Sequence, residues 1–177
     1  MSVGLLVTAA GLLSVERVAY IAIWRDPRRF TKACARSTWP RWQDPVSALT
    51  WLFIGFKVVQ VAVFLAWCYV HGAGSIMPTA PSTALVVGAS LLALGQLLNA
   101  SVFYQLGSTG VFYGNRFGHD VRWCRRFPFS HLRHPQYVGT VLSIWGFFLI
   151  MRFPNPDWVA LPLLETVYYA ISATLED

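Results

Sequence analysis

The sequence predicts an all-α integral membrane protein: a helical bundle of four to five apolar helices, the last two forming a helical hairpin. Three observations lead to this fold class. Of the 177 residues, 55% are hydrophobic, and the mean hydropathy is +0.48. Charged residues make up 12%, compared with about 25% in soluble domains. The charges are also clustered, so long stretches carry almost none, as in chains embedded in lipid.

Five apolar segments are predicted to be helices, because a bilayer admits only helices or closed barrels. They cover residues 3–24, 46–70, 82–106, 136–151 and 158–175. The fourth segment is short for a span of about 20 residues. It is expected to tilt, or to form a hairpin with the fifth across "MRFPNPDW", whose two prolines suit a tight reversal. A chain of this length predicts a single membrane-embedded domain over residues 1–177.

Ionisable residues occur within three of these segments. The first segment lacks a basic leader and contains Glu16 and Arg17, so it is predicted to be a retained helix rather than a cleaved signal peptide. Lys57 comes 12 residues after Pro45 and Glu165 comes 11 residues before Glu176, so both are expected on the order of 17 Å from the same membrane face. Because charges within a membrane usually pair, we expect these two residues to approach each other. The alternative is a Lys57 that reaches the interface and a neutral Glu165.

The third segment carries small and polar residues on one face, at spacings of one, three, four and seven positions. They are Gly88, Gly95, Gln96 and Asn99. One interpretation is close helix packing with hydrogen bonds between helices. The other is a groove in which a ligand lies.

The connecting loops differ sharply in basic residues. The loop 25–45 has six and the loop 107–135 has five, whereas the loop 71–81 has no Lys or Arg. If every segment crosses, the two basic loops and the terminal "TLED" share one side, which the positive-inside rule makes cytosolic. The N-terminus then lies opposite, unless the first segment dips in without crossing.

The net charge of +6 does not indicate a nucleic-acid-binding protein, because the basic residues flank apolar segments. Cys34, Cys68 and Cys124 form no CxxC and no metal-ligand spacing. We therefore expect free thiols, no metal site and no nucleic-acid partner.

The stretch "SHLRHPQYVG", residues 130–139, places polar chemistry at the start of an apolar helix. Arg133 suits a carboxylate or phosphate, and His134 exchanges protons near neutral pH. Tyr137 offers a ring and a hydroxyl, and Gly139 permits close approach. An interfacial anchor for the helix end is the alternative interpretation.

A larger pattern resembles a known family. "RHPQYVG", then an apolar helix, "NP" and a terminal acidic pair, is similar to the membrane methyltransferases that include isoprenylcysteine carboxyl methyltransferases and phospholipid N-methyltransferases. The elements "GQLLN", "YQLG", "GVFYGNRFG", "FPF" and "PQYVG" look like the phosphatidylethanolamine branch, especially its plant-type members. The resemblance extends from about residue 88 to the end, so it assigns residues 81–177 the cofactor-binding and catalytic part and residues 1–80 the N-terminal helices.

The resemblance implies S-adenosylmethionine as cofactor. The family's Gly-x-Gly motif falls on Ala93, Leu94 and Gly95, with alanine in place of the first glycine. Its terminal glutamate pair falls on Glu176 and Asp177, with aspartate in the second position. The residues that the resemblance assigns to the cofactor are Ala93, Leu94, Gly95, Arg133, His134, Tyr137, Gly139, Glu176 and Asp177.

Catalysis is assigned to His134, Tyr137 and Glu176, and lipid binding to Tyr113, Arg116 and Arg133. His134 or Glu176 would accept the proton of the attacking amine. The glycine-rich "GSTGVFYGNRFG" lacks the GxGxxG and P-loop patterns, so we interpret it as a segment of close approach under the cofactor or headgroup.

The implied function is methylation of phosphatidyl-N-methylethanolamine and phosphatidyl-N,N-dimethylethanolamine, with phosphatidylethanolamine as a further acceptor, in phosphatidylcholine synthesis in the endoplasmic reticulum. Alternatives are prenylcysteine carboxyl methylation, a membrane reductase of similar fold that uses a nicotinamide cofactor, and a lipid-binding or scaffold protein.

Overall fold

The computed structural model describes residues 3–121, 124–153 and 155–176, and all regular structure within them is helical. Four helices are long and apolar enough to cross a membrane, and a shorter apolar helix joins them. The elements are α1 (Val3–Arg25), α2 (Pro27–Ala35), α3 (Pro40–Gln43), α4 (Pro45–His71), α5 (Ser82–Val111), η1 (Gly114–Phe117), α6 (Pro135–Ile150), η2 (Pro156–Val159) and α7 (Ala160–Leu175). The predicted fold class is thus confirmed.

Proline and acidic caps set where several helices begin. Pro27, Pro45 and Pro135 each occupy the first turn of a helix, where the missing N–H costs little. Asp26 accepts a hydrogen bond from the backbone N–H of Arg29, and Asp44 accepts one from that of Ser47. These side chains satisfy donors that a helix start leaves unpaired.

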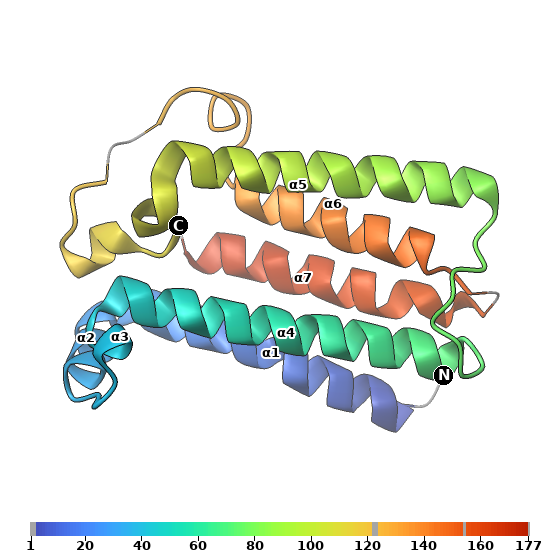
Figure 1. The fold of residues 1–177 in the computed structure, drawn as a ribbon, viewed down its shortest axis with the longest axis horizontal. Helices are drawn as coiled ribbons and strands as arrows, with labels where there is room; N and C mark the ends of the chain where they lie inside the picture. Colours follow the sequence, from blue (N-terminus) through green and yellow to red (C-terminus); the bar gives the residue numbers. More distant parts are fainter. Residues whose placement is uncertain (1–2, 122–123, 154, 177) are drawn as a thin grey trace.

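The long helices run alternately in opposite directions along one axis (Figure 1). α5 and α6 lie together along one side of the bundle, α1 and α4 lie along the other, and α7 lies between them. α2, α3, η1 and the C-terminus gather at one end, called here the basic end, and the N-terminus lies at the opposite end. The expectation that the two basic loops and the C-terminus share one end is therefore confirmed.

Glycines bring α5 and α6 into close contact. A Cβ atom on Gly95 would lie 2.3 Å from the carbonyl oxygen of Gly139, and one on Gly88 would lie 2.8 Å from that of Gly146. The Gln96 amide also donates to the Ser143 hydroxyl at 2.9 Å. The packing interpretation is therefore confirmed for Gly88, Gly95 and Gln96, whereas Gln96 and Asn99 also line a cavity between α4, α5 and α6.

The predicted segments match the observed helices, but the connections contain more structure than the sequence indicated. The third segment was predicted to end at 106, and α5 continues to Val111 through a break at Gly107, where φ is +63°. The first basic loop folds into α2 and α3. The sequence does not indicate these short helices, because they lack the long apolar segments that predict the other helices.

Candidate functional site

A cavity of about 560 Å³ opens at the basic end; we call it the mouth cavity. Its walls come from α1, from the end of α5 and the turn after it, from the start of α6 and from the C-terminus. Its lining residues are Trp24, Val102, Leu106, Gly110, Val111, Tyr113, Asn115, Arg116, Phe129, Arg133, His134, Pro135, Gln136, Tyr137 and Glu176. The structure thus brings together all the residues assigned to catalysis and lipid binding.

The glycine-rich segment shapes one wall of this cavity. Gly107 at φ +63° and Tyr113 at φ +58° adopt left-handed conformations that turn the chain after α5. Because of this turn, Arg116 reaches α1, where its guanidinium donates to the Trp24 carbonyl oxygen at 2.6 Å and lies 4.3 Å from the Trp24 ring centre. Arg116 therefore joins the turn after α5 to α1, and it also lines the mouth cavity.

Glu176 is the central acidic group of the mouth cavity. The Tyr137 hydroxyl donates a hydrogen bond to its Oε2 atom, and Tyr113 lines the same cavity. Its Oε1 atom is buried and accepts no hydrogen bond from the residues that the structure describes. Burial raises the pKa of Glu176 above the usual 4.5, and the two tyrosines only partly offset this shift.

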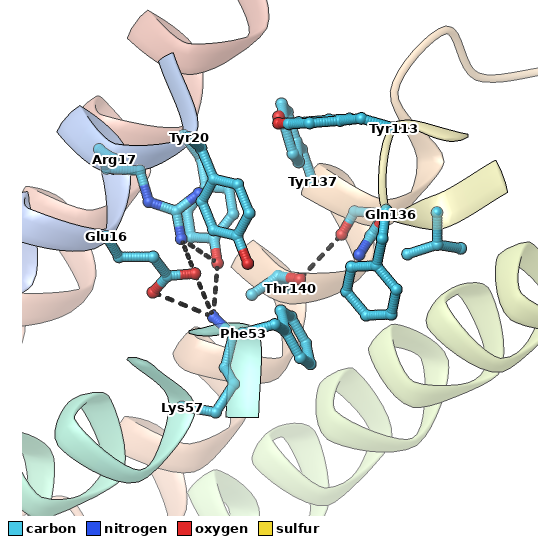
Figure 2. Close-up of a pocket in the computed structure, with 12 residues that line it drawn as sticks. Glu16, Arg17, Tyr20, Phe53, Lys57, Tyr113, Gln136, Tyr137 and Thr140 are labelled. Carbon is cyan, nitrogen blue, oxygen red and sulfur yellow. Dashed lines mark hydrogen bonds and ion pairs between the residues drawn. The ribbon is translucent and has the colours of Figure 1, made fainter. Parts of the chain in front are cut away.

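A second cavity, of about 50 Å³, lies deeper in the bundle, and we call it the core cavity (Figure 2). Glu16 pairs with Arg17 at 2.7 Å and with Lys57 at 3.0 Å. The Tyr169 hydroxyl accepts hydrogen bonds from Arg17 at 2.9 Å and from Lys57 at 3.2 Å. Tyr113, Gln136 and Tyr137 line this cavity as well as the mouth cavity.

Lys57 and Glu165 approach each other as expected, with Gln60 between them. Lys57 donates to the Gln60 side-chain oxygen at 2.9 Å, and the Gln60 amide donates to Glu165 at 2.7 Å. Glu16 is the direct ion-pair partner of Lys57, which the sequence analysis did not foresee. The signal was present, because Glu16 is a second acidic residue inside an apolar helix.

A third cavity, of about 550 Å³, lies between α4, α5 and α6, and we call it the lateral cavity. It shares Phe53, Lys57, Gln136 and Thr140 with the core cavity. Much of its remaining wall is apolar, with Phe64, Phe103, Ile144 and Phe147 among the lining residues. The core cavity therefore adjoins both the mouth cavity and the lateral cavity, and Gln136 lines all three.

Five residues assigned from the resemblance lie away from these cavities or outside the description. Ala93 and Leu94 are exposed on α5. Gly95 and Gly139 face each other between α5 and α6. Asp177 lies outside the described residues. The structure therefore does not bring the Gly-x-Gly position to the mouth cavity.

Sequence reasoning also missed residues that line the core cavity. Tyr20 and Tyr169 come from α1 and α7, and neither belongs to a motif. The Tyr169 ring lies edge-on to Tyr137, with centroids 5.5 Å apart, and Tyr137 stacks on His134 at 5.7 Å. The site thus combines a carboxylate, basic groups and aromatic rings. This set suits a ligand that carries both a positive and a negative charge.

Comparisons with known proteins match this chain to phospholipid methyltransferases. A family model described as phospholipid methyltransferase matches residues 83–177. The chain is 48% identical over 54 residues to the phosphatidyl-N-methylethanolamine N-methyltransferase of Arabidopsis thaliana, covering 30% of this chain and 33% of that protein. It is 42% identical over 70 residues to the Saccharomyces cerevisiae protein of that name, covering 38% of this chain and 34% of that protein.

A third relative matches a longer stretch. The phosphatidylethanolamine N-methyltransferase of Rattus norvegicus is 33% identical over 97 residues, covering 54% of this chain and 47% of that protein. The chain thus spans less than half the length of these curated relatives. No solved structure matches it significantly. Because the family model covers more than half of the chain, including the mouth cavity from Val102 to Glu176, the chain belongs to the phospholipid methyltransferase family.

Proposed function

We propose that this protein transfers methyl groups from S-adenosylmethionine to the amine of phosphatidyl-N-methylethanolamine and phosphatidyl-N,N-dimethylethanolamine, and also to phosphatidylethanolamine. The observation that carries this proposal is the partly buried Glu176 carboxylate, held by Tyr137 in a cavity at the basic end. Family membership and the names of the relatives support the same reaction. These names do not favour prenylcysteine methylation or reduction.

The residues of the mouth cavity fit the cofactor. Because the Glu176 Oε1 atom is buried with no partner in the described part of the chain, an ammonium donor would satisfy it. Arg133 lines the same cavity and suits a carboxylate. The rings of Tyr113 and Tyr137 suit a cationic centre. When bound, S-adenosylmethionine supplies a methyl group on a positively charged sulfur.

The protein's own contribution is positioning and proton removal. Methyl transfer is a single displacement, so fixing donor and acceptor in line supplies much of the acceleration. The attacking nitrogen must be neutral, and His134 or Glu176 accepts its proton, directly or through water. Both residues line the mouth cavity, and Tyr137 contacts both.

We propose an orientation that places this chemistry on the cytosolic face of a membrane, the endoplasmic reticulum in a eukaryotic cell. The basic loops lie at the same end as the mouth cavity, and positive residues favour the cytosolic side. The cofactor would then enter from water and the lipid from the bilayer. Residues 81–177 carry most of the mouth cavity, and residues 1–80 complete it through Trp24.

The test is methyl transfer from labelled S-adenosylmethionine by purified protein in lipid-containing micelles. Phosphatidylethanolamine, its monomethyl and dimethyl forms and a prenylcysteine are offered in parallel. We expect label in the phospholipids, greatest with the monomethyl and dimethyl forms. We expect Glu176→Gln to lose it, because the amide removes the charge at nearly constant size.

Asp26→Asn is the matched control. It makes the same carboxylate-to-amide change at the basic end, but asparagine still caps α2. Its activity should equal that of the unmodified protein. Label only in prenylcysteine, or an active Glu176→Gln variant, would contradict the proposal.

A further inference from the structure

We propose that the core cavity binds the phosphate group of the lipid acceptor, with Arg17, Tyr20 and Lys57 as its donors. This inference rests on the proposed function and specifies how the headgroup is oriented. It assigns a substrate subsite to α1 and α4, which lie outside the region matched by the family model.

The charge around the core cavity favours an anion. Glu16 and Arg17 are only 5% and 7% exposed. Glu16 forms direct ion pairs with two cations, Arg17 and Lys57. Glu165, the next acidic group, is linked to Lys57 through Gln60 and does not line the core cavity. Among the described residues that line this cavity, two cations therefore face one carboxylate inside an apolar bundle, which favours a bound anion.

Two buried polar groups at this site lack a hydrogen-bond partner among the described residues. The Tyr20 hydroxyl and the Arg17 Nε atom are buried and make no hydrogen bond within residues 3–121, 124–153 and 155–176. Tyr20 is 8% exposed, and it points into the space bordered by Arg17, Lys57 and Thr140 (Figure 2). A buried donor without a partner is costly, so a bound oxyanion would remove that cost.

The size and position of the core cavity suit one phosphate group. Its volume of about 50 Å³ holds roughly four water-sized groups. On one side it adjoins the lateral cavity through Lys57 and Thr140, and on the other the mouth cavity through Tyr113 and Tyr137. A lipid lying along this series would place acyl chain against the phenylalanines, phosphate in the core cavity and amine near Glu176.

The test compares two single-chain probes in detergent micelles. Hexadecylphosphocholine carries phosphate and a trimethylammonium group, and hexadecyltrimethylammonium carries the same chain and cation without phosphate. Binding is measured by calorimetry, so the result does not depend on methyl transfer. We expect the unmodified protein to bind the phosphate probe at least tenfold more tightly.

Tyr20→Phe is the decisive variant. It removes a hydroxyl that has no partner, so thermal stability should be unchanged or slightly higher. The preference for the phosphate probe should fall about tenfold, since a hydrogen bond to a charged group is lost. Tyr168→Phe is the control, because its hydroxyl bonds the Ala10 carbonyl oxygen and it lines none of the three cavities. Lys57→Met should reduce the preference as well.

Equal binding of the two probes would overturn the proposal, as would an unchanged preference in Tyr20→Phe. Loss of stability and of affinity for both probes would also overturn it, since that pattern indicates a structural role. Failure of methyl transfer with an intact phosphate preference would instead contradict only the proposed function.

Discussion

At the scale of single residues, Glu176 shows how environment sets chemistry. Burial disfavours the ionised carboxylate and raises the pKa, whereas the hydrogen bond from Tyr137 and the nearby Tyr113 favour ionisation and lower it. Burial outweighs the hydrogen bonds. The folded state therefore holds the proton at pH values where the unfolded chain has lost it, and the free energy of unfolding falls as pH rises through this window.

Cofactor binding should depend on pH in the opposite sense. Under the proposed function, the ionised form of Glu176 is the one that would hold the ammonium group of S-adenosylmethionine, so the affinity for this cofactor should rise as pH increases above 4.5 through the raised pKa. Glu176→Gln should flatten this rise and weaken binding by about 1.5–3 kcal/mol. Calorimetric titration of both proteins across pH measures it.

An affinity that is independent of pH in the unmodified protein would contradict this assignment. A pH dependence that remains undiminished in Glu176→Gln would contradict it as well.

At the scale of elements, the contact between α5 and α6 determines where the mouth cavity forms. Gly88 and Gly95 on one helix meet Gly146 and Gly139 on the other. This close approach positions the start of α6, and with it Tyr137, beside the end of α5. The glycines therefore act on the site through helix packing.

Gly95→Ala should separate the two helices. Its Cβ atom would lie 2.3 Å from the Gly139 carbonyl oxygen and 2.4 Å from the Ser143 hydroxyl, so backbone must move. We expect a loss of about 1–3 kcal/mol in the free energy of unfolding, measured by denaturant titration in micelles.

Gly55→Ala provides the control, because the added Cβ atom meets nothing within 4 Å. There the change should be neutral or stabilising by up to about 1 kcal/mol, as expected for alanine in a helix. If the two variants were equally stable, the packing role of Gly95 would be wrong.

At the scale of the whole molecule, the alternating directions of the long helices place successive loops at opposite ends of the bundle. The basic loops, the mouth cavity and the C-terminus lie at one end, and the loop after α4 lies at the other. The lateral cavity lies between α4, α5 and α6, away from either end loop. In a bilayer, this arrangement would place the mouth cavity toward water and the lateral cavity within the helical span.

Single cysteines, introduced into a variant without cysteines, should show on which side of the membrane each loop lies. Thr38→Cys and His119→Cys, both at exposed positions in the basic loops, should react with an impermeant maleimide from one side of sealed vesicles. Ser75→Cys, exposed in the other loop, should react only from the opposite side. In cells the first two should face the cytosol. Labelling of all three from one side would refute the alternation.

The sequence by itself determined the helical membrane fold, the positions of five helices, the end at which the basic loops gather and the family resemblance. Each of these depends on local properties: apolar length, loop charge, and contiguous motifs such as "RHPQYVG". The sequence also anticipated the approach of Lys57 and Glu165, but only the tertiary structure decided the direct pairings between distant residues. Glu16 lies 41 positions from Lys57, and Tyr137 lies 39 positions from Glu176. No periodicity encodes such pairings, because they depend on helix rotation and depth, which side-chain packing sets.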